Sequence, residues 1–512
     1  MADILFGQSY YLRFDPKLYA AMQPYPPLGA LYAASYLRAR GWDVALFDAM
    51  LAESEQEWAA VLDRYTPRYA VLFEDNFNYL SKMCLLRMRA AAFTMIDMAK
   101  TRSCTVILCG ADVTDHSPKY FEHGADFALL GEGEETLGEL LDRLSGRTDT
   151  PLENILGLAY PISDVGFGNA DSAIRNPQSA IRINPRRPDI TQLDELPFPA
   201  WDLVDIPRYR KVWRERHGYY SMNMVTTRGC PYHCNWCAKP IWGQRYNSRS
   251  PENVAAEMKW LKETYRPDHI WFADDIFGLK PGWIERFGKL VKAQDAAIPF
   301  KCLSRADLIK PSVVEGLKAA GCQIVWMGAE SGSQKILDAM DKGTNVPQIY
   351  EARRLLGDAG IRVAFFLQFG YPGETRRDVE RTLQLVRETM PDDIGISVSY
   401  PLPGTKFYER VKSQLGQKQN WVDSDDLAML YQGPFPQPFY RMLHRVVHGE
   451  FRMRRAGLAL KRDLLRPLRW RMRHLRLLAS LPYHWLSWKI NRLRLNRIER
   501  SAASPASALE SR

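Results

Sequence analysis

Short apolar segments alternate with amphipathic stretches along most of the chain, and this pattern constrains the fold more than any other feature. Apolar runs occur first at residues 4–7, 44–47, 69–73, 105–109 and 126–130, separated by helical patterns near 27–40, 53–65, 82–100 and 134–144. Continuous apolar strands joined by helices form parallel sheets covered on both faces. We therefore expect an α/β chain in which residues 1–145 form a doubly wound, Rossmann-like domain, with its ligand beyond the carboxyl ends of the strands.

A second alternating series follows after a turn-rich segment. Its strand-like runs lie at 222–227, 269–273, 300–304, 323–328, 363–370 and 394–400, with helical patterns such as PENVAAEMKWLKE and RRDVERTLQLVRE between them. Six such units predict a partial (β/α)6 TIM-like barrel over residues 222–435, with its chemistry at the carboxyl ends of the strands. Residues 146–221 are interpreted as a connector that packs on its neighbours.

The composition excludes several protein classes. With 46% hydrophobic and 25% charged residues, the chain is neither disordered nor fibrous. No apolar run approaches the roughly 18 residues of a membrane span, and the acidic Asp3 in a start without a basic segment argues against a secretory signal. Eight cysteines are too few for a disulfide scaffold and indicate a reducing compartment, so a cytoplasmic location is expected.

The formal charge of +10 is concentrated near the end of the chain. Residues 441–500 hold 17 Lys and Arg against three acids, a local +14, which leaves 52 basic and 56 acidic residues elsewhere. We expect 436–500 to be a basic helical region, interrupted at Pro467 and Pro482, and 501–512 to be disordered. Three interpretations stay open for this region: an accessory bundle on the barrel, a peripheral contact with an anionic membrane on its inner face, or RNA binding, which is the least expected.

Three cysteines stand together in TTRGCPYHCNWC, directly after a predicted strand. Cys230, Cys234 and Cys237 have the spacing Cys-x3-Cys-x2-Cys. Three thiolates in one loop can hold three corners of a 4Fe–4S cluster and leave one iron open. A zinc site with a distant fourth ligand and inert thiols are the alternatives, although the spacing of His233 suits no usual zinc knuckle. The other cysteines are predicted to be small buried hydrophobic residues: Cys84, Cys104, Cys109, Cys302 and Cys322.

The cysteine triplet, with the aromatic Trp236 before its third member, resembles the radical S-adenosylmethionine (SAM) superfamily. The resemblance implies that the three cysteines are the catalytic, cluster-binding residues and that SAM chelates the open iron. It also implies that the reduced cluster cleaves SAM to methionine and a 5′-deoxyadenosyl radical. An external one-electron reductant of the flavodoxin or ferredoxin type is then required.

The same resemblance implies SAM contacts where the barrel strands end. In FADDIF one aspartate would accept hydrogen bonds from the SAM ammonium, while the other reading is a helix N-cap. A guanidinium at Arg305 suits the SAM carboxylate or ribose, and Ser331 and Gly332 resemble a turn beside the ribose. The implied SAM-binding residues are Trp236, Asp274, Asp275, Ser304, Arg305, Glu330 and Gln368.

The first domain lacks the GxGxxG motif of dinucleotide-binding domains. Its GEGEE segment (131–135) would place acids where a phosphate needs a positive helix end. The segments PPLGALYAASYLRARGWDV, CGADVTDHSP and GADFALLGEGEET instead resemble the cobalamin-binding domain fused to many radical SAM proteins. The implied cobalamin contacts are Tyr10, Glu74, Asp75, Asn76, Gly110, Ala111, Asp112, Thr114, Gly131, Glu132 and Gly133, whereas Tyr11 and Phe14 face either the corrin or the core.

Two features depart from the wider cobalamin-binding pattern. The usual Gly-Gly after the fourth strand is Gly110-Ala111, and the Asp-x-His-x-x-Gly motif is absent, since the domain's histidines are His116 and His123. No histidine is therefore expected on the lower axial face of the cobalamin. A degenerate domain that binds nothing is the alternative.

Together these features predict a radical SAM enzyme, with a cobalamin-dependent C- (or P-) methyltransferase acting on a small molecule, lipid or isoprenoid as the principal hypothesis. A cobalamin-associated oxidative cyclase or rearrangement enzyme is the first alternative. A non-enzymatic metal-cluster protein that binds nucleic acid or membrane is the second. An RNA methylthiotransferase is not expected, because residues 1–220 contain no second cysteine triplet.

Overall fold

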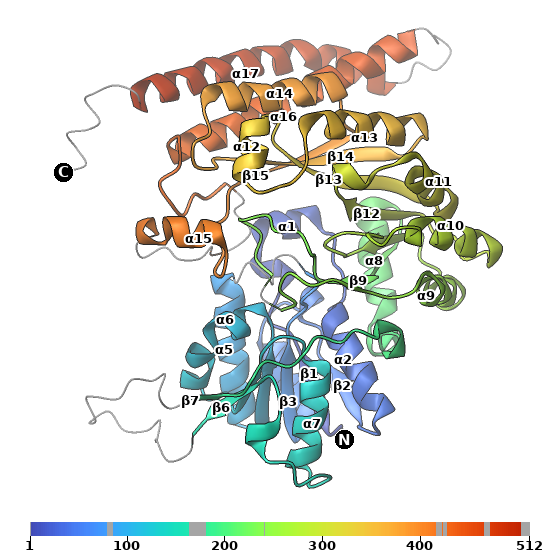
Figure 1. The fold of residues 1–512 in the computed structure, drawn as a ribbon, viewed down its shortest axis with the longest axis vertical. Coiled ribbons are helices and arrows are strands. Elements are labelled where there is room, and N and C mark those ends of the chain that lie inside the picture. The colour runs from blue at the N-terminus through green and yellow to red at the C-terminus, as the bar shows by residue number, and fades with distance from the viewer. Residues whose placement is uncertain are drawn as a thin grey trace.

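The computed structural model describes residues 2–78, 85–162, 181–239, 241–415, 422, 427–464 and 472–502 (Figure 1). Its first sheet has the strand order β2-β1-β3-β4-β5-β6-β7. The five predicted strands are present and parallel: β1 (Ile4–Gly7), β2 (Val44–Leu46), β3 (Tyr69–Phe73), β4 (Thr105–Cys109) and β5 (Phe127–Leu129). From β1 the chain first adds β2 on one side and then adds β3 on the other, so the strand order changes direction at β1. Doubly wound sheets bind their ligands at such a switch point.

Helices cover both faces of this sheet, as the apolar strands require. They are α2 (Leu28–Ala39), α3 (Gln56–Tyr65), α5 (Leu86–Lys100), α6 (Ala111–Glu122) and α7 (Glu134–Leu144). Successive residues of β1 point to opposite sides, so Leu5 packs in one core cluster and Ile4 and Phe6 in another.

The segment predicted as a connector also builds the first sheet. Its β6 (Leu158–Pro161) and β7 (Ile181–Ile183) add two antiparallel strands at the edge beside β5. Neither strand carries a long apolar run, which is why the sequence pattern did not predict them. The later α8 (Ile206–His217) packs against the first domain, where the buried Trp213 donates a hydrogen bond to the carbonyl of Pro24.

The second sheet is the predicted six-stranded parallel barrel segment, in sequential order. Its strands are β8 (Ser221–Met224), β11 (His269–Phe272), β12 (Phe300–Ser304), β13 (Cys322–Glu330), β14 (Arg362–Phe369) and β15 (Asp393–Val398). The helices between them are α9 (Pro251–Thr264), α10 (Trp283–Ala293), α11 (Pro311–Ala320), α12 (Gln334–Ala339), α13 (Val346–Asp358) and α14 (Arg376–Thr389), and α15 (Lys406–Val411) follows β15. This confirms the α/β fold class.

The cysteines outside the triplet pack as small hydrophobic residues, as predicted. Cys104, Cys109, Cys302 and Cys322 are buried and free, while Cys84 lies outside the described residues.

The basic region forms two long helices that pack on each other and on the barrel, α16 (Gln437–Leu464) and α17 (Met472–Ala502) (Figure 1). Arg387 of α14 donates hydrogen bonds of 2.6 and 3.0 Å to Glu450, and Arg376 donates one of 3.0 Å to Glu499. The predicted break at Pro482 is wrong, because α17 continues through it. Proline disfavours a helix interior, and the packing of α17 on α16 supplies stabilisation that the local sequence does not show. Pro467 lies outside the described residues.

Ser501 and Ala502 end α17, and the rest of the predicted disordered tail lies outside the described residues. Among the helices described, none is both long and apolar enough to cross a bilayer.

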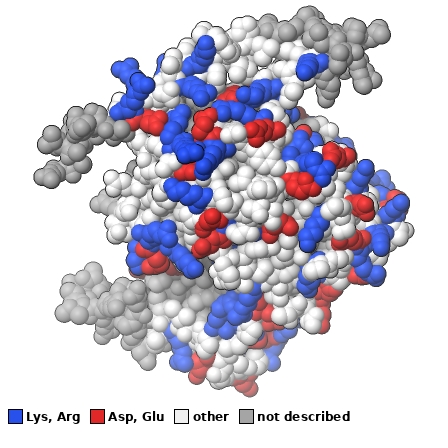
Figure 2. All heavy atoms as spheres, turned by 45° about the horizontal axis from the view of Figure 1, so that its top comes forward, with Lys and Arg blue, Asp and Glu red and all other residues white. Residues whose placement is uncertain are grey.

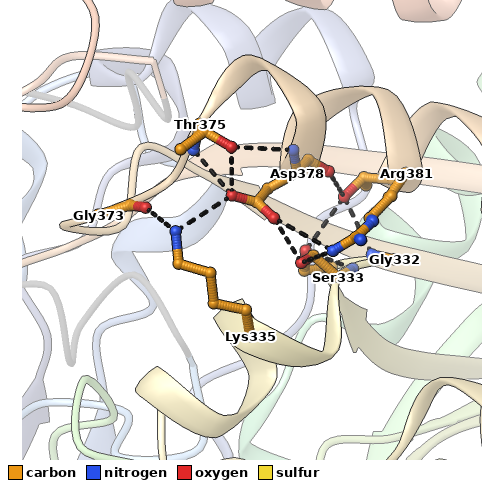
Figure 3. A network of polar contacts seen from close by, with 9 residues as sticks. Gly332, Ser333, Lys335, Gly373, Thr375, Asp378 and Arg381 are labelled. Atoms are coloured by element: carbon orange, nitrogen blue, oxygen red, sulfur yellow. Dashed lines mark hydrogen bonds and ion pairs between the residues drawn. The ribbon is translucent and has the colours of Figure 1, made fainter.

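A polar network anchors the turn after β13 to the start of α14 (Figure 3). Asp378 accepts hydrogen bonds from the Ser333 hydroxyl (2.6 Å) and from the backbone and hydroxyl of Thr375 (2.9 and 2.6 Å). A Cβ at Gly332 would lie 2.3 Å from the Arg381 carbonyl oxygen, so only glycine permits this approach. The Ser331-Gly332 turn is thus fixed by α14.

We expect Asp378→Asn to lower the free energy of unfolding by about 1–3 kcal/mol at pH 7, because it weakens several buried hydrogen bonds. Burial by itself would raise the pKa of Asp378, but these hydrogen bonds lower it to about 2. The stabilisation is therefore full above the unfolded pKa near 3.9 and is lost as the pH falls through about 2. Urea unfolding between pH 7 and about pH 2 measures this loss. The exposed Asp358→Asn is the control, and equal losses in the two variants would contradict the assignment.

Candidate active site

The cysteine triplet lies in a loop whose two ends are paired. The short strands β9 (Thr227–Arg228) and β10 (Asn247–Ser248) form an antiparallel ribbon that closes this loop. Cys230 is buried, and Cys234 and Cys237 are half-buried. Burial, assisted by the charge of Asp275, raises the pKa of the Cys237 thiol to about 12. A ligand that binds the thiolate must therefore displace this proton.

The donor set fits a cluster better than a single ion. Within the described residues, no three Cys, His, Asp or Glu side chains converge on one metal position. A mononuclear zinc site needs such convergence. In a 4Fe–4S cluster each thiolate binds a different iron, so the sulfur atoms stay further apart. The three cysteines would hold the cluster and leave its fourth iron open.

Two cations flank Cys234. The Nη1 of Arg305 lies 3.8 Å from the Cys234 Sγ, its guanidinium stacks 3.6 Å from the ring centroid of Tyr232, and Nη2 donates to the Lys342 carbonyl at 2.8 Å. Lys342 is buried. Although burial would lower its pKa, the charges of Glu330 and Cys234 raise it. Sequence reasoning missed Lys342, because its turn carries no recognisable motif.

Glu330, at the end of β13, receives the Lys342 ammonium in a 2.7 Å ion pair. Its backbone has a φ of +56°, a strained conformation for a residue with a side chain. A Cβ at Gly328 would lie 2.6 Å from the Glu330 Oε1 and 2.7 Å from the Lys342 Nζ, so glycine makes room for this pair. Glu330 thus holds the Lys342 ammonium in place, and this ammonium interacts with Cys234 of the cysteine loop.

The two adjacent aspartates have different roles. Asp274 is buried and accepts hydrogen bonds from the Thr226 backbone and hydroxyl (both 2.7 Å) and from the Thr227 backbone (2.9 Å). Burial raises its pKa to about 6. Asp275 is exposed and raises the pKa values of Cys230 and Cys237 by its charge. Asp274 therefore holds the strand end, whereas the charge of Asp275 acts on the cysteine thiols.

The other residues implied for SAM binding lie along the same loop and strand ends. Trp236 is half-buried within the loop, and Ser304 is buried where β12 ends. Gln368 of β14 is only 2% exposed, and neither its Oε1 nor its Nε2 has a hydrogen-bond partner in the described part of the chain. A buried amide without partners is rare in a folded protein, so Gln368 keeps hydrogen-bonding capacity for a ligand or a water molecule.

The carboxyl edge of the first sheet also contains unpartnered amide oxygens. Among described residues, Gln8 Oε1 after β1 and Asn76 Oδ1 after β3 are buried and accept no hydrogen bond. Between them, Glu74 accepts a 2.9 Å hydrogen bond from the Ser9 backbone, and burial raises its pKa to about 7. Polar groups at a switch point that lack partners fit a ligand rich in amide groups, as cobalamin is.

Several residues implied for cobalamin also hold the framework. Both oxygens of Asp112 pair with Arg89 at 2.6 and 2.7 Å, and Thr114 donates to the Gly110 carbonyl at 2.9 Å. Asp75 accepts from the backbones of Gly29 and Phe77. The others pack in the core or form its turns: Tyr10, Tyr11, Phe14, Ala111, Gly131 and Gly133.

A buried ion pair joins the two domains. Arg228, two residues before the first cysteine, donates to Glu132 at 3.0 Å and to Glu134 at 2.7 Å. Glu132 also accepts a 2.8 Å hydrogen bond from Trp242, whose ring stacks on Phe77 at 5.3 Å. The carboxyl edge of the first sheet therefore faces the cysteine loop.

We expect Arg228→Met to destabilise the protein by about 3–5 kcal/mol, because it leaves two glutamates buried without a cation. Adding Glu132→Gln and Glu134→Gln should restore much of this loss in urea unfolding. The exposed Arg286→Met is the control, with a change of at most about 0.5 kcal/mol. A triple variant no more stable than Arg228→Met would contradict the pairing.

Comparisons with known proteins agree with this geometry. A family model described as the Radical SAM superfamily matches residues 224–386. An uncharacterized methyltransferase of Pyrococcus horikoshii is 27% identical over 77% of this chain and 81% of the relative. The hopanoid C-3 methylase of Methylococcus capsulatus is 25% identical over 86% and 79%. The anaerobic magnesium-protoporphyrin IX monomethyl ester cyclase of Rubrivivax gelatinosus is 24% identical over 78% and 68%.

Among solved structures, the fold resembles that of the cobalamin-dependent SAM radical enzyme OxsB with aqua-cobalamin bound. The match has a TM-score of 0.68 and 16% identity, and it covers 96% of this chain and 72% of the OxsB chain. This likeness concerns the fold. Together with the family match, it gives the chain a radical SAM domain over residues 224–386 within a fold like that of this cobalamin-dependent enzyme.

Proposed function

We propose that this radical SAM enzyme is a cobalamin-dependent methyltransferase that acts on an unactivated carbon (or phosphorus) of a small molecule or lipid. One observation carries the proposal: the ion pair of Arg228 with Glu132 and Glu134 holds the switch-point edge of the first sheet directly against the cysteine loop. A cofactor on that edge and a radical formed at the loop would then act on one substrate between them.

The chain's own residues have distinct tasks in this scheme. When bound, the cluster supplies the electron that cleaves SAM, and cobalamin supplies the transferable methyl group. Asp275 offers a carboxylate to the SAM ammonium, whereas Arg305 and Lys342 place positive charge beside Cys234. The amides of Gln368, Gln8 and Asn76 offer hydrogen bonds. The external reductant is expected to be a flavodoxin or ferredoxin.

An oxidative cyclase is the second candidate, because one relative of similar coverage has that name. The two functions differ in their products. A methyltransferase forms a methylated product and S-adenosylhomocysteine, whereas a cyclase forms an unmethylated ring. Anaerobic protein reconstituted with iron, sulfide and hydroxocobalamin, and incubated with SAM, reductant and a lipid and pigment extract, separates them by mass spectrometry.

We expect Cys234→Ala to lose the iron–sulfur absorbance and to form 5′-deoxyadenosine only at background level, because the cluster loses one of its three thiolates. Cys104→Ala, a buried cysteine of the first domain, is the matched control and should keep both properties. Full 5′-deoxyadenosine formation by Cys234→Ala, or zinc in place of iron in the wild type, would favour the non-enzymatic alternative.

We further propose that α17 rests on an anionic membrane. Its solvent-facing side is apolar over Tyr483, Leu486, Ile490 and Leu493, which recur at three- and four-residue spacing and are 71%, 54%, 40% and 69% exposed. Arg497 and Arg500 continue the same spacing. Figure 2, in which this end of the molecule comes forward, shows Lys and Arg among uncharged side chains. Exposed apolar residues with flanking cations are typical of interfacial helices and less typical of RNA contacts.

Sedimentation with vesicles tests this contact. We expect the chain to bind vesicles containing phosphatidylglycerol more tightly than pure phosphatidylcholine vesicles, since each basic residue near the surface contributes about 1 kcal/mol. Leu486→Asp with Leu493→Asp should weaken binding by at least about tenfold. Leu86→Asp, at an exposed leucine of α5, should have no effect. Unchanged binding of the double variant would contradict the proposal.

A further inference from the structure

The face of the barrel sheet opposite its helices is incompletely covered. Along β12, Phe300, Cys302 and Ser304 are buried, whereas Lys301 and Leu303 between them are partly exposed. The register places Lys301 beside Trp271 of β11 and Ile324 of β13. These side chains therefore lie on the inner face of the partial barrel, with Lys301 near the amino ends of its strands and the cysteine loop beyond the carboxyl ends.

Lys301 has an unusual environment on this face. Its Nζ lies 5.0 Å from the ring centroid of Trp271 and 5.5 Å from that of Tyr25, which the first domain contributes. Burial alone lowers its pKa to about 8. The titratable groups that face it are His269, whose pKa burial lowers to about 3, and Arg362, and neither carries negative charge. In the described part of the chain, no hydrogen bond or ion pair to a carboxylate satisfies this ammonium.

An aromatic wall lies along the same face. Trp326, two residues beyond Ile324, packs against Phe366 with ring centroids 4.7 Å apart. Phe366 remains 40% exposed although it lies in a central strand of the sheet. The neighbouring residue in β15 is Gly395, where a Cβ would lie 3.2 Å from the Phe366 ring and 3.3 Å from the Trp326 ring.

A partly buried ammonium with aromatic neighbours gains little from water and needs an anion to complete its hydrogen bonds. A neutral apolar substrate would cover the aromatic wall and desolvate Lys301 further without compensation. We infer that the inner face binds an amphiphilic anion, whose carboxylate or phosphate pairs with Lys301 while its apolar body packs on Trp326 and Phe366. This inference rests on the proposed function only in identifying that anion as the substrate.

A pair of probes that differ in charge tests the assignment. The aromatic anion 8-anilino-1-naphthalenesulfonate and the uncharged N-phenyl-1-naphthylamine share their ring system, and equilibrium dialysis of the full-length reconstituted protein gives the affinity for each. We expect Lys301→Met to weaken binding of the anion about tenfold, the scale of one charge-assisted contact, and to leave the neutral probe unchanged. Lys301→Arg should retain the affinity for the anion, and Phe366→Ala should lower the affinity for both probes.

Lys289→Met, at an exposed lysine of α10, is the matched control and should change neither affinity. Unchanged binding of the anion by Lys301→Met, or an equal loss of both probes, would overturn the inference. The same preparations are assayed for 5′-deoxyadenosine. If the wild type forms none but the probes behave as expected, the proposed function fails while the anion site stands.

Discussion

The relation between the two domains depends on the buried contact of Arg228 with Glu132 and Glu134. All three side chains are at most 5% exposed. Charges at this depth cost several kcal/mol unless they are paired, so the interface is stable only in the register that brings them together. Because Arg228 closes the ribbon at the start of the cysteine loop, the contact that docks the domains also positions the sulfur ligands. One continuous apolar core, which includes Leu28 and Phe77 of the first domain with barrel residues, surrounds this contact.

Some of the buried polar groups without partners lie at the strand ends near this interface. Buried amide atoms that lack partners in the described chain include those of Gln8 and Asn76 at the carboxyl edge of the first sheet, and of Asn223 and Gln368 in the barrel strands. Three cations lie in the barrel domain. Arg305 and Lys342 lie beside Cys234, and Lys301 lies beside Trp271 on the inner face of the barrel. Elsewhere comparable charges are paired, as in Arg89 with Asp112. Gln8, Asn76 and Gln368 therefore keep hydrogen-bonding capacity at the two strand-end regions that carry the implied ligand contacts.

The sequence pattern predicted the parallel strands well, because a strand buried on both faces is a continuous apolar run. It failed for β6 and β7, which are short edge strands with few apolar residues, and at Pro482, which α17 accommodates. For the site, it predicted the strand ends that carry polar residues but not which residue of each group faces a ligand. Asp112 and Glu132 show this limit, because long-range partners occupy both carboxylates.

The order of the elements, the fold class and the cysteine loop were determined by the sequence alone, since each rests on a local pattern of apolar periodicity or spacing. The tertiary structure decided that Asp274 holds a strand end while Asp275 faces the cysteines. It also decided that Lys342, which stands in no motif, lies beside Cys234, and that Lys301 lies on the inner face of the barrel. The physical reason is that burial and hydrogen-bond partners come from other strands and helices, and these determine whether a charged group is already paired or free to bind.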